Sequence, residues 1–168
     1  MGMDVCGNAP KNEKGDYFRN NVWWWRPLWN YCYEIAPDVL NEETYRAGQF
    51  NDGEGLDEAG SLMLARRLRE ELANGNTLAY EKRYMAELAQ LPEETCEYCQ
   101  GTGVRNDAVG QAHGMPERDN PHTGGKGWCN GCDGKGTVAS FEASYPFSEE
   151  NVLEFTEFLE NCGGFGIY

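Results

Sequence analysis

Two stretches of the sequence share one frame of cysteines and glycines: CEYCQGTG at residues 96–103 and CNGCDGKG at residues 129–136. Each Cys-x-x-Cys pair can place two thiolates at the neck of a tight turn, and two facing turns supply the four sulfurs of a tetrahedral zinc site. The pattern predicts one Zn²⁺ bound by Cys96, Cys99, Cys129 and Cys132. Because four cysteines leave no open position for a catalytic water, we expect the ion to be structural.

The glycines of the frame have a separate expected role. Glycine lets the backbone fold back toward sulfur with positive φ, so that amide groups can donate hydrogen bonds to the thiolates. Four positions are predicted to act in this way: Gly101, Gly103, Gly134 and Gly136.

This double frame resembles the cysteine-rich zinc domain of DnaJ-type chaperones, which is built on repeats of the same frame. The resemblance covers only residues 96–136, and it implies that the four cysteines bind one zinc between them. The sequence has two repeats rather than four, no J-domain sequence and no recognisable client-binding half, so chaperone function does not carry over. The arrangement is also similar to anti-TRAP, a small regulator that inhibits another protein, which implies a scaffold for protein contacts.

Other stretches, MGMDV, YFRNNVWWWRPLW and CGGFGIY, loosely resemble small proteins of bacteria and their phages, which suggests a setting but no activity. An alternative chemistry for the cysteine pairs is thiol redox exchange, as in thioredoxin-like proteins, but the doubled frame with its glycines argues against it. The segment between the frames, residues 104–128, is polar and glycine-rich and is predicted to be a long, mobile loop. We expect its two histidines, His113 and His122, to be exposed to solvent rather than bound to metal.

The elements that must carry these residues form a predicted α+β fold, with a small sheet of terminal strands and three to four helices. Residues 1–93 with 137–168 are expected to form the body, and residues 94–136 a zinc-binding insert. MDVCG is a candidate first strand. A helix with Pro27 in its first turn is predicted to run to Ala36, and its buried face is Trp25, Leu28, Trp29, Cys32 and Ile35.

Residues 37–56 are expected to be irregular or a short strand. Helices are predicted at 57–74 and 77–91, joined so closely that an antiparallel pair is expected. The predicted inner residues are Leu62, Ala65, Leu68 and Leu72 in the first helix and Leu78, Met85 and Leu88 in the second.

The last part of the chain has strand composition at 137–147, followed by a helix with Ser148 as its N-cap. The inner face of that helix is predicted to be Val152, Phe155, Leu159 and Cys162, and the other side carries Glu150, Glu154 and Glu157. The closing FGIY is expected to pair as a strand with TVASFEA or with MDVC.

The charge of the chain limits its partners. Twenty-eight acidic residues against 14 basic ones give a formal net charge of −14, which argues against direct nucleic-acid binding and against acidic membranes. The sequence contains no apolar run of transmembrane length and no secretory signal, so we expect a cytoplasmic protein with reduced thiols. The remaining cysteines, Cys6, Cys32 and Cys162, then fit single buried thiols.

Two groups of residues are candidates for a partner-binding surface. The first is aromatic and basic, Trp23, Trp24, Trp25 and Arg26; the alternative is core packing, with at least one of these tryptophans partly exposed. The second is acidic, Glu150, Glu154 and Glu157, which can keep the protein soluble or imitate the phosphates of nucleic acid.

Enzymatic signatures are missing from the sequence: it has no P-loop, no Gly-x-Gly-x-x-Gly and no Gly-x-Ser-x-Gly. We therefore expect a zinc-binding, non-enzymatic protein-protein interaction module that regulates or inhibits a partner protein in a bacterial or phage setting. The alternative is an acidic nucleic-acid mimic that blocks the basic groove of a host defence protein. A thiol redox or chaperone-like protein is the third hypothesis, and the oligomeric state stays open.

Overall fold

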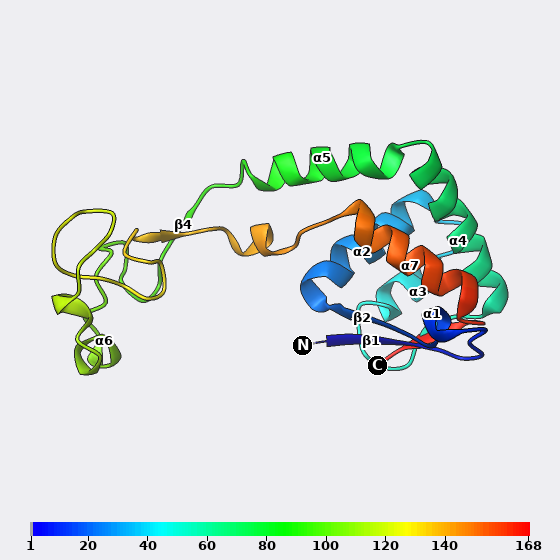
Figure 1. The fold of residues 1–168 in the computed structure, drawn as a ribbon, viewed down its shortest axis with the longest axis horizontal. Helices are drawn as coiled ribbons and strands as arrows, with labels where there is room; N and C mark the ends of the chain where they lie inside the picture. The colour runs from blue at the N-terminus through cyan, green and yellow to red at the C-terminus, as the bar shows by residue number, and fades with distance from the viewer. Residues whose placement is uncertain (1) are drawn as a thin grey trace. The chain divides into compact units, whose positions relative to one another are not determined.

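The computed structural model describes residues 2–168 (Figure 1). The chain divides into two compact units, Met1–Glu87 with Tyr145–Tyr168, called the body unit below, and Leu88–Ser144, called the cysteine unit. Helices and antiparallel strands occur together, so the predicted α+β class is confirmed. The predicted insert, residues 94–136, falls inside the cysteine unit.

The body unit contains one four-stranded sheet and six helices among its described residues. The strands are β1 (Gly2–Gly7), β2 (Tyr17–Asn21), β3 (Gly55–Leu56) and β6 (Phe165–Ile167), in the order β2-β1-β6-β3 with antiparallel neighbours. Val5 lies opposite Phe18 on one side and Ile167 on the other. The pairing of FGIY with MDVC is therefore confirmed, and strands β1 and β6 are neighbours in the sheet.

Helix α1 (Glu13–Asp16) is a single turn within a stretch that separates β1 from β2. Helix α2 (Val22–Ile35) begins where the side chain of Asn21 accepts hydrogen bonds from the amides of Trp23 and Trp24, at 3.0 and 3.1 Å. Pro27 therefore lies inside the helix, and its predicted place in the first turn is wrong because Asn21, not the proline, starts the helix.

The predicted inner face of α2 is confirmed for Trp25, Leu28, Trp29 and Cys32, which are fully buried; Ile35 is partly buried. Both buried indoles satisfy their N–H groups on backbone carbonyls, Trp25 on Gly48 at 2.7 Å and Trp29 on Tyr45 at 2.9 Å. These carbonyls belong to helix α3 (Glu42–Ala47) and its C-cap, in a segment expected to be irregular or a short strand. The sequence pattern did not predict this helix, which Asn41 caps by accepting a hydrogen bond from the amide of Thr44.

Helix α4 (Glu58–Ala73) has the predicted bounds to within a residue, with Asp57 as its N-cap. Its buried residues include Leu64, Ala65 and Leu68, whereas Leu62 is 38 % exposed, so that part of the predicted stripe is wrong. The stripe is rotated because α4 packs chiefly against α7 (Glu149–Asn161) and not against the helix that follows it.

Helix α5 (Asn76–Leu88) turns a different face inward from the one predicted: Leu88 is partly buried, but the other two predicted residues are not. Leu78 and Met85 are 39 % and 40 % exposed. The contacts come instead from aromatic residues: the ring of Tyr80 lies 4.7 Å from that of Tyr31 in α2 and 4.8 Å from that of Phe147. The predicted antiparallel pairing of α4 with α5 is therefore wrong, and Figure 1 shows α5 leaving the end of α4 at an angle.

Helix α7 confirms its prediction in full. Ser148 caps it by accepting from the amide of Asn151 at 3.2 Å, and Val152, Phe155, Leu159 and Cys162 are buried. Phe155 is the centre of an aromatic cluster that joins the sheet to the helices, with ring contacts to Phe18, Trp25, Phe158 and Phe165. Within residues 2–168, no helix has both the length and the apolar character needed to cross a membrane.

Candidate metal centre

The cysteine unit is built on a short two-stranded stem. Strands β4 (Glu94–Thr95) and β5 (Thr137–Val138) pair with Thr95 opposite Thr137, and the amide of Cys96 donates to the carbonyl of Gly136 at 2.9 Å. This pairing brings the beginning of the first cysteine frame to the end of the second. The predicted strand at 137–147 ends at Val138, because the chain then forms a 3₁₀ turn, η2 (Phe141–Ser144).

The four cysteine sulfurs lie together at the top of this stem. The ligand atoms of Cys96, Cys99, Cys129 and Cys132 are all within 4.8 Å of one another. Across the two frames, Sγ of Cys96 lies 3.9 Å from Sγ of Cys129, and Sγ of Cys99 lies 3.7 Å from Sγ of Cys132. All four side chains are buried, none more than 6 % exposed, and all are free thiols.

The two cross-frame distances match the edges of a tetrahedral metal site. With metal–sulfur bonds of about 2.3 Å, a tetrahedron of four thiolates around zinc has edges of about 3.8 Å. The two cross-frame distances, 3.7 and 3.9 Å, lie on either side of that value, whereas a disulfide requires its sulfurs to be about 2.05 Å apart. The cluster is therefore a possible metal centre with an all-sulfur donor set, as expected for a zinc-finger-like module.

Backbone amides of the two frames point at sulfur in matching positions. The amide of Gly103 donates to Sγ of Cys99 at 3.3 Å, and that of Gly136 donates to Sγ of Cys132 at 3.1 Å. Both glycines were predicted to act in this way. Such hydrogen bonds spread the negative charge of a thiolate and stabilise it in a buried site.

The glycines also allow the two frames to approach one another. A Cβ atom on Gly103 would lie 2.5 Å from the carbonyl oxygen of Gly134, and one on Gly136 would lie 2.4 Å from that of Gly101. All four have positive φ, between 74° and 89°. Gln100 and Asp133, at the same position in each frame, share a positive φ of 52° that sequence analysis did not anticipate. The repeat in the sequence is thus a repeat of backbone conformation.

Burial and hydrogen bonding act in opposite directions on the thiols. Burial acts to raise the pKa of Cys99, but hydrogen bonds, first that from the Gly103 amide and then those from neighbouring sulfurs, outweigh it and lower the pKa to about 7. Burial raises the pKa of Cys129 to about 12 and also raises that of Cys132. In the absence of metal, Cys99 is therefore the thiol that ionises ahead of Cys129 and Cys132, and metal binding must release their protons.

The segment between the frames contains regular structure, so the prediction of one long loop is wrong. It contains helix α6 (Ala108–Ala112) and a 3₁₀ turn, η1 (Met115–Glu117). Asn120, which sequence analysis missed, is 3 % exposed; it donates to the Gly134 carbonyl at 3.0 Å and accepts from the amide of His122 at 2.9 Å. The Asn-Pro pair at 120–121 was a usable signal, because asparagine commonly closes turns on its own backbone.

The histidines of this segment lie outside the cluster. The metal-competent group found among residues 2–168 consists of the four cysteines alone. Nε2 of His122 lies 3.5 Å from a carboxylate oxygen of Asp133, and both side chains are largely exposed.

The two candidate partner surfaces lie in the body unit, and the residues within each surface differ in exposure and in contacts. Trp25 is buried, whereas Trp23 and Trp24 are partly exposed. Arg26 is exposed and donates to the hydroxyl of Tyr145 at 3.1 Å. In α7, Glu150 and Glu154 are exposed, while Glu157 forms an ion pair with Lys14 at 2.5 Å.

Comparison with known proteins gives no relative for this chain: no family model, no curated protein and no solved structure matches it.

Proposed function

We propose that the cysteine unit binds one structural Zn²⁺ ion through Cys96, Cys99, Cys129 and Cys132, as the resemblance to the DnaJ-type module implies. The observation that carries this is the agreement between the cross-frame sulfur distances, 3.7 and 3.9 Å, and the edge of a ZnS₄ tetrahedron. When bound, the ion supplies folding free energy and no reaction, because all four positions around it are protein sulfurs. The chain itself supplies the amides of Gly103 and Gly136, which hold charge on sulfur.

We further propose that the zinc-bound unit is a non-enzymatic module for contact with a protein partner, acting as a regulator or inhibitor. Its support is an exposed aromatic side chain beside the metal centre: Tyr98 is 56 % exposed, and the guanidinium of Arg105, whose side chain is 11 % exposed, lies 4.5 Å from the centre of its ring. Three hydrogen bonds that Arg105 donates to the carboxylate of Asp107 fix the arginine in this position. Rigid aromatic and arginine side chains of this kind dominate the energy of many protein interfaces.

Native mass spectrometry of protein purified without a metal-affinity tag tests the zinc site. We expect one zinc per chain, which is lost in a Cys96→Ser, Cys129→Ser variant and retained in Cys6→Ser, a matched control at a thiol outside the cluster. A chain without metal whose mass is two hydrogens lower for each cysteine pair would contradict the proposal and establish disulfides.

The contact function is tested by binding experiments in bacterial lysate with immobilised zinc-loaded chain. We expect a retained protein that is lost from a Tyr98→Ser, Arg105→Ala variant which still binds zinc. If the retained protein is instead released by added DNA and by salt, the acidic-mimic alternative replaces this proposal, because exposed charges are screened over about 10 Å at 0.1 M salt.

A further inference from the structure

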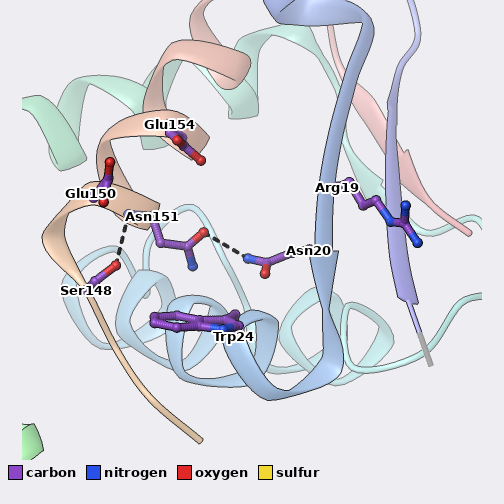
Figure 2. Close-up of a pocket in the computed structure, with 7 residues that line it drawn as sticks. All are labelled: Arg19, Asn20, Trp24, Ser148, Glu150, Asn151 and Glu154. Atoms are coloured by element: carbon purple, nitrogen blue, oxygen red, sulfur yellow. Dashed lines mark hydrogen bonds between the residues drawn. The ribbon is translucent and has the colours of Figure 1, made fainter.

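An open pocket of about 360 Å³ in the body unit lies between the end of β2 and the first turns of α7 (Figure 2). Two of the residues that line it are joined by a hydrogen bond: Nδ2 of Asn20 donates to Oδ1 of Asn151 at 3.0 Å. Asn20 is 7 % exposed, and Asn151 is held in turn by the Ser148 cap. The pocket is therefore preformed by hydrogen bonds.

Four of the five carboxylates of α7 form two pairs, and only one pair has partners. Glu157 and Glu160, in the second half of the helix, form ion pairs with Lys14 and Arg69. Glu150 and Glu154, in the first half, line the pocket, and neither carboxylate has an ion pair or a hydrogen bond with any residue between 2 and 168. Two negative charges are thus left available at this one place on the helix.

Trp24 shows the same contrast among the tryptophans of α2. The ring of Trp23 packs on Tyr145, and those of Trp25 and Trp29 stack on each other. Trp24 has no ring partner within the described chain, and it lines the pocket while remaining partly exposed. In Figure 2 its indole lies below the side chain of Asn151, another residue that lines the pocket.

We propose that this pocket binds a guanidinium group, stacked on the face of Trp24 and paired with the carboxylates of Glu154 and Glu150. Guanidinium is planar and weakly hydrated, so it stacks on indole and pairs with carboxylate at the same time, which a compact and strongly hydrated ammonium does less well. The cation that lines the pocket, Arg19, extends on the other side of β2 from Trp24 in Figure 2. The site is separate from the cysteine cluster and does not depend on zinc.

Nuclear magnetic resonance of the zinc-loaded full chain tests the assignment with a blocked arginine, N-acetyl-arginine methylamide. We expect saturable millimolar binding, seen as shifts of the Trp24 indole N–H and the Asn151 side-chain amide. Blocked citrulline, which has the same shape without the charge, should not bind, and blocked lysine should bind about three- to fivefold more weakly. Equal shifts with citrulline, equal binding of lysine, or no shift at Trp24 would each overturn the proposal.

Matched variants locate the site. Glu154→Gln and Trp24→Leu should each weaken binding of the blocked arginine about three- to fivefold or more, whereas Glu142→Gln, an exposed carboxylate in the cysteine unit, should leave it unchanged. Retained signal dispersion in Glu154→Gln shows that the loss is not due to unfolding. Two further probes distinguish the sources of guanidinium. If the peptide Gly-Arg-Gly binds as tightly as the blocked arginine, the site is assigned to a protein partner. If free methylguanidinium binds and the peptide does not, the site is assigned to a small molecule. Unaltered affinity in both variants would overturn the site.

Discussion

The two units of this chain reach a folded state by different means. The body unit buries a continuous set of large apolar side chains around Trp25, Trp29, Phe155 and Phe165. In the cysteine unit the buried cluster consists of the four cysteines, with only Val138 packed against it. A few sulfur atoms cannot replace the free energy of burying an apolar core, so the difference indicates that the cysteine unit depends on its metal while the body unit does not.

The largest expected effect is selective unfolding on removal of metal. A strong chelator should collapse the amide signals of residues 96–136 to unfolded positions and leave those of residues 2–87 dispersed, because only the cysteine unit lacks an apolar core. Heteronuclear NMR measures both units in one sample, and added zinc should restore the lost signals. If the amide signals of the cysteine unit stay dispersed without metal, the claim that this unit depends on metal to fold is wrong.

The converse experiment acts on the body unit. Phe155→Ala deletes the ring that contacts Phe18, Trp25 and Phe165, and it should lower the free energy of unfolding by about 3–5 kcal/mol. Urea unfolding followed by tryptophan fluorescence measures this loss. The zinc content of the folded variant should stay at the wild-type value; a loss of zinc would mean that the two units are coupled.

A smaller loss of stability is expected from adding a methyl group where the backbones of the two cysteine frames lie in close contact. Gly103→Ala would place its Cβ 2.5 Å from the Gly134 carbonyl at a φ of 74°, whereas Gly114→Ala, at a φ of 63°, meets nothing within 4 Å. The second variant therefore isolates backbone strain, about 1 kcal/mol. The first should exceed it by at least about 1 kcal/mol because of overpacking. Zinc competition with a colorimetric chelator compares them, and equal losses would show that the frames do not need close approach.

The smallest effect concerns the ion pair of Arg69 with Glu160, whose two hydrogen bonds are 2.7 and 2.8 Å. The pair lowers the pKa of Glu160, so its stabilisation is present above the usual glutamate pKa of about 4.3 and is lost as pH falls through the lowered value. Since both side chains are more than a third exposed, Glu160→Gln should cost less than about 1 kcal/mol at pH 7 and nothing at low pH. Thermal unfolding across this pH range measures it, with Glu154→Gln as the unpaired control.

Sequence patterns predicted the structure correctly where a motif or spacing within one short stretch determined it. The doubled cysteine frame located the cluster, and Ser148 with the spacing of Val152, Phe155 and Leu159 located α7 and its inner face. The pairing of FGIY with MDVC was one of two alternatives that the sequence left open, and the structure shows this one.

Sequence patterns failed where the buried face of an element depended on which other helices or strands pack against it. Leu78 and Met85 have helical spacing but are exposed, because Tyr80 and Tyr84 on the other face meet Phe147. The order of residues 104–128 depends on single polar contacts such as that of Asn120 with Gly134, which carry no hydrophobic pattern. The pocket at Trp24 joins β2, α2 and α7, and nothing in the local sequence of any one of them indicates the other two.

The pairing of Val5 with Ile167 has a consequence for the order of events during folding. Because β1 is an inner strand of the sheet and its partner β6 lies about 160 residues later in the sequence, a nascent chain on the ribosome cannot complete this sheet until residues 165–167 have emerged. The cysteine unit is under no such restriction, since its stem and ligands are local. By joining residues 94–95 to 137–138, its folding would shorten the effective loop that the body unit must close, so zinc should speed the refolding of a unit that does not bind it.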